Sequence, residues 1–183
     1  MNRLEIFNIL QPIVKTVTGV STVILANQTM PDGSGIPAPS GEYVTIEPKQ
    51  SISQRGQSNQ YRTQNDIART VAVDIRAQVI VEASINVYRG DYAISRVSRL
   101  QQCHKRPDVL ATLFKAGLGW QRVSAPNNLT RLQSGNPEQR AQIYVYLMYE
   151  TSDIVTINNI ESVGLTLLDV DNNVLYNDTG LQP

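Results

Sequence analysis

The sequence predicts an α+β fold in which a mainly antiparallel sheet is covered on one face by helices. Residues 70–88 carry an apolar side chain at every odd position and mostly polar or charged side chains at even positions. Side chains of a strand alternate between faces, so this pattern indicates a sheet with one buried face. Three other stretches, 3–17, 91–105 and 107–116, repeat their apolar residues at helical spacing. We therefore expect these helices to cover the buried face.

The 70–88 stretch is long for a chain of this size. At roughly 3.3 Å per residue it would span on the order of 55–60 Å. A 20 kDa domain measures about 35–40 Å across by the usual scaling of compact chains. One end of the strand should therefore bend sharply or protrude, and the simplest arrangement is a hairpin arm over about 43–88.

Composition narrows the possible functions. The chain has 183 residues, 16 Lys+Arg and 16 Asp+Glu, so its formal net charge is zero and a dedicated nucleic-acid binder is disfavoured. A single cysteine leaves no disulfide framework, and no apolar run is long enough for a membrane span. The N-terminus lacks a signal-peptide pattern. We expect one domain over 1–183, made in reducing cytosol.

The N-terminal third predicts a helix, a strand and a loop. Asn2 and Glu5 have the spacing of a capping box for the 3–17 helix, and Gly19 should end it. Pro12 lies inside the pattern and should kink or break the helix. A short strand follows at 22–26, and the Pro/Gly-rich segment 31–41 should be a loop.

Residues 43–48 resume a strand, and 49–69 are almost entirely polar. We interpret 49–69 as an exposed hairpin tip or a disordered loop. Its three arginines are diluted by Gln and Asn and would hold nucleic acid only weakly. The segment is therefore either a solvated arm or a protein-binding arm. The candidate partner contacts on it are Arg55, Gln57, Tyr61, Arg62 and Arg69.

Two helices and further strands complete the pattern. Asp91 should cap the 91–105 helix, and Pro107 suits the first position of the next one. Leu110, Leu113 and Phe114 should form the buried face of that second helix. Strands are expected at 118–123, 140–153 and 160–168, with a loop over 125–136, a turn at 171–173 and a short strand at 174–176 pairing back. The C-terminal extension begins at about residue 166.

The sequence offers no catalytic set. His104 and Cys103 are neighbours on a predicted helix and would point apart, and no G-x-S-x-G nucleophile motif occurs. Asp169, Asp171 and Asn173 resemble the start of a calcium loop, but valine and glycine stand where its glycine and closing glutamate belong. We predict no catalytic, cofactor-binding or metal-binding residues and no enzymatic activity.

Several segments resemble, in order, the tail-terminator or neck-terminator proteins of tailed bacteriophages. The resemblance covers roughly residues 2–165, whereas the 31–41 loop and the tail after Leu165 depart from the pattern. The segments that carry it are the first helix ending in Val17-Thr18-Gly19, then Ala26-Asn27-Gln28-Thr29-Met30-Pro31, Tyr43-Val44-Thr45-Ile46, the polar hairpin, Tyr88-Arg89-Gly90-Asp91 and Ile157-Asn158-Asn159-Ile160-Glu161-Ser162-Val163.

This resemblance implies a structural virion protein at the junction of tail and neck. Such proteins form a hexameric ring that caps the tail tube and joins it to the neck, with DNA passing through the lumen. The implied partners are further copies of the chain, the tail tube protein, the neck or head-completion protein and, as a further candidate, the sheath protein. Another phage connector, such as a head-completion or baseplate subunit, and an enzyme with an unrecognised site are the alternatives.

Overall fold

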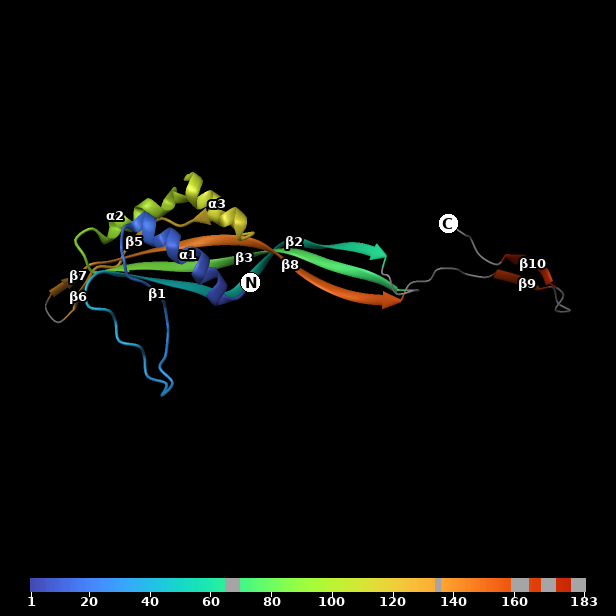
Figure 1. Cartoon of the computed structure of the whole chain (residues 1–183), viewed down its shortest axis with the longest axis horizontal. Coiled ribbons are helices and arrows are strands. Elements are labelled where there is room, and N and C mark those ends of the chain that lie inside the picture. The colour runs from blue at the N-terminus through green and yellow to red at the C-terminus, as the bar shows by residue number, and fades with distance from the viewer. Residues whose placement is uncertain (65–69, 134–135, 159–164, 169–173, 179–183) are drawn as a thin grey trace. The chain divides into compact units, whose positions relative to one another are not determined.

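Six strands form the main sheet, in the order β1-β2-β3-β8-β4, with β5 also pairing with β8. Their bounds are β1 Val23–Leu25, β2 Tyr43–Gln64, β3 Thr70–Tyr88, β4 Gly119–Val123, β5 Asn127–Asn128 and β8 Arg140–Asn158. β1 runs parallel to β2, whereas β4 and β5 run antiparallel to β8. β2, β3 and β8 alternate in direction (Figure 1). The mainly antiparallel sheet of the prediction is confirmed.

This computed structural model describes residues 1–64, 70–133, 136–158, 165–168 and 174–178. The chain divides into two compact units. The first unit comprises Met1–Gln57 and Ala77–Thr151, and the second comprises Ser58–Arg76 and Ser152–Pro183. β2, β3 and β8 each contribute residues to both units. Among the described residues, none of the helices is long and apolar enough to cross a bilayer.

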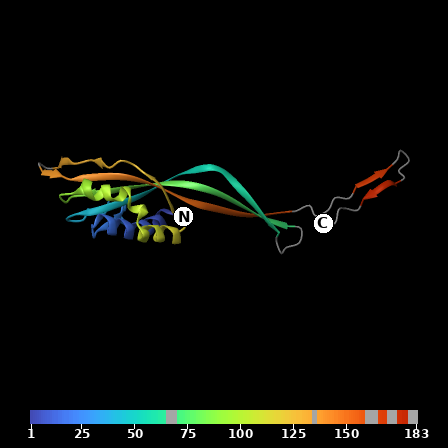
Figure 2. The ribbon, with the colours of Figure 1, turned by 90° about the horizontal axis from the view of Figure 1, so that it is seen from above.

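The helices α1 (Arg3–Thr18), α2 (Ala93–Ser98) and α3 (Pro107–Lys115) lie on one side of the sheet in the first unit (Figure 2). They bury the odd-numbered face of β3, as the alternation predicts. Val81 is 1% exposed and Ile85 is 0% exposed. The same core takes side chains from the helices and from β2 and β8, among them Leu10, Val14, Val44, Ile46, Val97, Leu100, Ile143 and Leu147.

Helix α1 begins and ends as predicted. The Asn2 side chain accepts a hydrogen bond from the Glu5 N–H, and the Glu5 carboxylate accepts one from the Asn2 N–H. Gly19 closes the helix in a left-handed conformation with φ 74°. The expectation that Pro12 could break the helix is wrong, because α1 continues through it. Pro12 is exposed, so the carbonyl that loses its helical partner can turn to water.

The single helix predicted over 91–105 is wrong in two respects. The segment is α2 followed by two 3-10 turns, η1 Arg99–Gln101 and η2 Cys103–Lys105. Val97, Leu100 and Cys103 are buried at intervals of three residues, which is the period of a 3-10 helix. Asp91 is not the cap, since the N-cap position is Tyr92 and no side chain caps this helix.

Pro107 occupies the first turn of α3, as predicted, but the predicted buried face is only partly right. Val109 and Leu113 are buried, whereas Leu110 is 59% and Phe114 is 84% exposed. One turn separates Val109 from Leu113, so the stripe facing the core is a single narrow row.

Two predicted loops contain strand structure. β2 continues to Gln64, so the polar segment is strand rather than loop over 49–64. This part of β2 has polar side chains on both faces, so neither face needs to be buried and the strand can be highly exposed. The predicted 125–136 loop holds β5, β6 (Arg131–Gln133) and the start of β7 (Asn136–Glu138), and β6 pairs with β7.

At the C-terminus, β9 (Leu165–Leu168) and β10 (Val174–Asp178) form an antiparallel pair, which confirms that residues 174–176 pair back. β8 ends at Asn158, five residues beyond the predicted 153. The remainder of the strand predicted over 160–168, and the turn at 171–173, lie outside the described residues.

Candidate interaction surface

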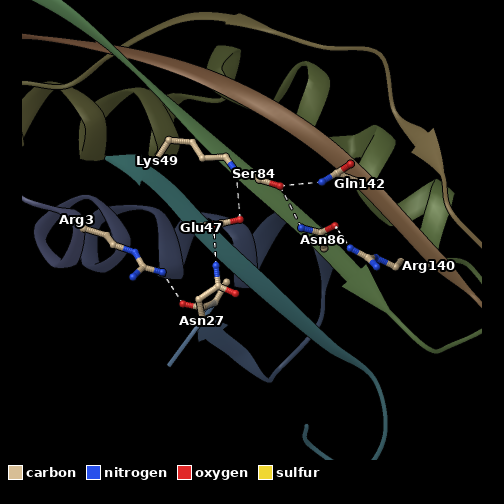
Figure 3. Close-up of polar contacts among 9 residues, drawn as sticks. Arg3, Asn27, Glu47, Lys49, Ser84, Asn86, Arg140 and Gln142 are labelled. Atoms are coloured by element: carbon tan, nitrogen blue, oxygen red, sulfur yellow. Dashed lines mark hydrogen bonds and ion pairs between the residues drawn. The ribbon is translucent and has the colours of Figure 1, made fainter. Parts of the chain in front are cut away.

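The face of the sheet opposite the helices, here called the helix-free face, carries a chain of polar contacts in the first unit (Figure 3). Gln142 Nε2 donates to Ser84 Oγ at 3.0 Å, and Asn86 Nδ2 donates to the same oxygen at 3.1 Å. Arg140 Nη2 donates to Asn86 Oδ1 at 3.2 Å. These contacts tie β3 to β8 side chain by side chain.

The even positions Ser84 and Asn86 are therefore not open to water, although the alternation predicts a wet face. Ser84 is 1% and Asn86 is 5% exposed. Their hydrogen bonds satisfy them where they lie, which removes most of the cost of burying polar groups. This part of the helix-free face is preorganised.

Two stacked tyrosines lie at the end of this face. The rings of Tyr43 and Tyr88 have centroids 4.7 Å apart and an interplanar angle of 6°. The guanidinium of Arg89 lies 5.6 Å from the Tyr43 centroid, and that of Arg140 lies 4.8 Å from the Tyr88 centroid. Arg89 Nε also donates to Glu138 Oε1 at 2.9 Å. Cations over tyrosine rings are stabilised by the electron density of the ring face.

A second aromatic contact lies further along β8. The guanidinium of Arg122 lies 3.8 Å from the centroid of the Tyr146 ring. The Tyr146 hydroxyl donates to Glu82, and this hydrogen bond is the largest cause of the raised pKa of Tyr146. Three strands, β3, β4 and β8, thus contribute to one small polar and aromatic cluster.

A second set of polar contacts in the first unit lies where the segment after β1 meets β2, a few residues beyond Tyr43 (Figure 3). Asn27 Nδ2 donates to Glu47 Oε1 at 2.7 Å, and Lys49 Nζ lies 3.4 Å from the other oxygen of Glu47. Arg3 donates from α1 to the carbonyl of Ala26. These contacts hold the segment after β1 against β2 and α1, so we assign them a structural role.

The predicted arm residues all lie on β2 except Arg69, which is outside the described residues. Arg55, Gln57, Tyr61 and Arg62 are exposed. Arg55 and Gln57 belong to the first unit, and Tyr61 and Arg62 to the second. The Arg55 guanidinium contacts the Met148 sulfur at 3.4 Å, and the Arg76 guanidinium lies 5.0 Å from the Tyr61 ring centroid. The structure therefore presents these four side chains at the surface without bringing them into one described site.

Cys103 and His104 do not form a reactive pair. Cys103 is buried, and burial raises the pKa of its thiol to about 11. His104 stacks on Trp120 with ring centroids 5.6 Å apart. In the described part of the chain, no group of three or more His, Cys, Asp or Glu side chains could hold a metal ion.

The sequence did not reveal the cluster around Tyr43, Tyr88, Arg89 and Arg140. The first three lie near strand ends that only the sheet order brings together with the start of β8. The available signal was an aromatic residue at an even, supposedly wet, position of the long strand. Tyr88 is that residue, and an aromatic at such a position indicates a surface with its own contacts.

Comparison with known proteins gives a family. A sequence model of the family described as phage neck terminator protein matches residues 4–171. No curated protein matches the chain. Among solved structures, the chain is similar to the sheath/tube terminator of PVC, an extracellular contractile injection system, determined by cryo-EM in the extended state. The identity is 11% and the TM-score 0.46; the match covers 93% of this chain but only 64% of that one.

Proposed function

The chain belongs to the family of phage neck terminator proteins, which are structural components of the virion tail, and we propose that six copies form a ring that terminates the tail tube. The ring joins the tube to the neck below the head, and DNA passes through its lumen. The observation that carries this proposal is the family match over residues 4–171. In this proposal the chain acts by assembly rather than by catalysis.

The edge of β2 supports assembly through strand pairing. β1 pairs with β2 only over Val44–Ile46, whereas β2 extends to Gln64. Within the described sheet, no further strand lies on that side of β2. A strand edge carries N–H and C=O groups that a neighbouring chain can satisfy. A contact between two different surfaces of identical subunits closes into a ring when its rotation allows.

The hairpin of β2 and β3 is the proposed arm of each subunit. Arg55, Gln57, Tyr61 and Arg62 are its proposed contacts with an adjacent subunit or the tail tube, together with Arg69. The other proposed partners are the neck or head-completion protein and the sheath protein. The zero formal net charge favours protein partners over DNA, which contacts the ring only during passage. Assembly takes place in the host cytoplasm before the finished virion leaves.

Size-exclusion chromatography with light scattering tests the ring directly. The purified chain should give a hexamer, alone or after addition of purified tail tube protein. Negative-stain images of tails carrying a labelled chain should show the label at the neck end. A chain that stays monomeric at high concentration, with tube protein present, contradicts the ring. A label at the opposite end of the tail would instead identify a baseplate subunit.

A further inference from the structure

A small pocket opens in the first unit where β2 begins, β3 ends and β8 begins. Its volume is about 280 Å³. The side chains that shape it are Tyr43, Tyr88, Arg89, Leu129, Glu138 and Arg140. Small-molecule pockets in proteins typically measure about 300–1,000 Å³, so this one suits a group of one or two residues rather than a large cofactor.

The charges of the pocket leave one positive charge without a counterion. Two guanidinium groups, Arg89 and Arg140, face one carboxylate, Glu138. Glu138 is already engaged, since it accepts from Arg89 Nε at 2.9 Å. Arg89 also donates from Nη1 to the carbonyl of Pro39. The charge that remains is that of Arg140.

The Arg140 guanidinium is held in place, and not all of its N–H donors have an acceptor in the described part of the chain. Its Nη2 donates to Asn86, and its guanidinium lies over the Tyr88 ring. Asn86 is itself fixed by Ser84, so the support behind the arginine is rigid. Among the described residues, the buried Nε of Arg140 has no acceptor. A guanidinium has five N–H donors, so donors on the two Nη groups of Arg140 remain for a ligand in the pocket, whereas the enclosed Nε is not one of them.

We propose that this pocket binds a single carboxylate presented by a segment of a partner protein, with the Arg140 guanidinium as its charge partner. A planar guanidinium matches the two oxygens of a carboxylate and can donate to both. The tyrosine rings and Leu129 provide apolar walls for the aliphatic stem that carries the carboxylate. The proposal concerns one folded chain and stands whether or not the chain forms a ring.

The pocket fits a carboxylate better than a nucleic-acid phosphate. One uncompensated positive charge matches one carboxylate, whereas affinity for nucleic acid comes from many phosphate contacts made at once. Glu138 in the wall disfavours any anion, so the pocket has room for one negative charge and not for the run of charges that a nucleic-acid backbone carries. The carboxylate can come from an acidic side chain or from a chain terminus, and the probes below separate these two sources.

The test uses the full chain and short peptides, with binding followed by ¹H–¹⁵N NMR of the Arg140 Nε–H and the backbone amides of Tyr88 and Arg140. The first peptide is Ala-Glu-Ala, acetylated and amidated, and its uncharged match is Ala-Gln-Ala. A third, acetyl-Ala-Ala-Ala with a free C-terminal carboxylate, is compared with its amidated form. We expect the carboxylate peptides of one or both sources to bind at least ten-fold more tightly than their neutral matches.

Three variants assign the binding to the pocket. Arg140→Gln should weaken the carboxylate peptide at least ten-fold. Glu138→Gln should strengthen it several-fold, because it removes the competing negative charge; this variant carries the test if Arg140→Gln fails to fold. Arg99→Gln, an exposed arginine outside the pocket, should leave the affinity unchanged. Equal binding of charged and neutral peptides, an unchanged affinity in Glu138→Gln, or shifts at these signals with oligothymidylate alone would overturn the proposal.

Discussion

Tyr43 of β2 stacks on Tyr88 of β3 with ring centroids 4.7 Å apart and an interplanar angle of 6°. Tyr43 is only 7% exposed, although it lies on the helix-free face. Stacked aromatic pairs contribute about 0.5–1.5 kcal/mol beyond the area that they bury. The pair therefore anchors the start of β2 to the end of β3, and both rings line the pocket.

The first prediction concerns alkaline pH. Burial, followed by the nearby Tyr88, raises the pKa of Tyr43 above its ordinary value of about 10. As the pH rises, Tyr43 therefore ionises first in the unfolded chain, which then binds fewer protons than the folded chain. The free energy of unfolding should fall above about pH 10. Tyr43→Phe should lose less stability between about pH 9 and 12 than the wild-type chain.

Thermal melts across this pH range measure the effect. Tyr61→Phe is the control, because Tyr61 is 51% exposed. Burial likewise raises the pKa of Tyr149, so the decline should not vanish entirely in Tyr43→Phe. A Tyr43→Phe profile that superimposes on that of Tyr61→Phe would show that Tyr43 contributes nothing to it.

The second prediction tests the alternation of β3. Val81 is 1% exposed, so Val81→Asp places a carboxylate without a partner in the core and should prevent folding. Glu82, next in the chain, faces the other side and accepts a hydrogen bond from Tyr146. Glu82→Ala should cost only about 1 kcal/mol, the usual net value of one hydrogen bond. Urea unfolding of both variants makes the comparison, and equal damage would mean that both faces are core.

The third prediction distinguishes two adjacent residues of α3. Leu113 is 2% exposed, and Leu113→Ala should cost about 2–5 kcal/mol through the cavity that it leaves. Phe114 is 84% exposed, so Phe114→Ala should change the free energy of unfolding by no more than about 0.5 kcal/mol. Chemical denaturation of the two variants is the measurement. A large loss in Phe114→Ala would restore the buried face predicted from the sequence.

Local rules predicted much of this fold. The capping box of Asn2 and Glu5, the stop at Gly19 and the bounds of β3 follow from a few neighbouring residues, and each is observed. The odd face of β3 is buried where β3 packs in the first unit, because alternation needs no knowledge of the partner strand. The order of the helices and the mainly antiparallel pairing of the sheet were predicted from the same local patterns.

The remainder depends on contacts that a linear pattern does not contain. The 91–105 segment has a helical pattern, but burial of Leu100 and Cys103 at intervals of three fits 3-10 turns instead. The polar composition of 49–64 suggested a loop, whereas pairing along the sheet makes it a strand. The candidate pocket joins Tyr43, Arg89 and Arg140, and only the order β2-β3-β8 brings them together.

The last prediction concerns the hairpin arm. We propose replacing Ser58–Arg76, the hairpin segment of the second unit, with a short turn that contains Asn-Gly, the preferred pair of tight hairpins. Among the described residues, this removes one buried hydrophobic side chain, Val73, so the first unit should still fold and melt cooperatively. Assembly should fail, because the proposed contacts Tyr61, Arg62 and Arg69 are gone.

Light scattering and negative-stain images of joined heads and tails measure that failure. In a matched control, the exposed loop at 31–37 is likewise replaced with a short turn, and this change should leave assembly unchanged. The physical reason for the difference is that a strand edge offers a row of N–H and C=O groups to a partner, whereas the Pro-containing loop offers few. If the arm variant melts normally and still forms rings that join tails to heads, the hairpin is not the contact and the ring closes through the first unit alone.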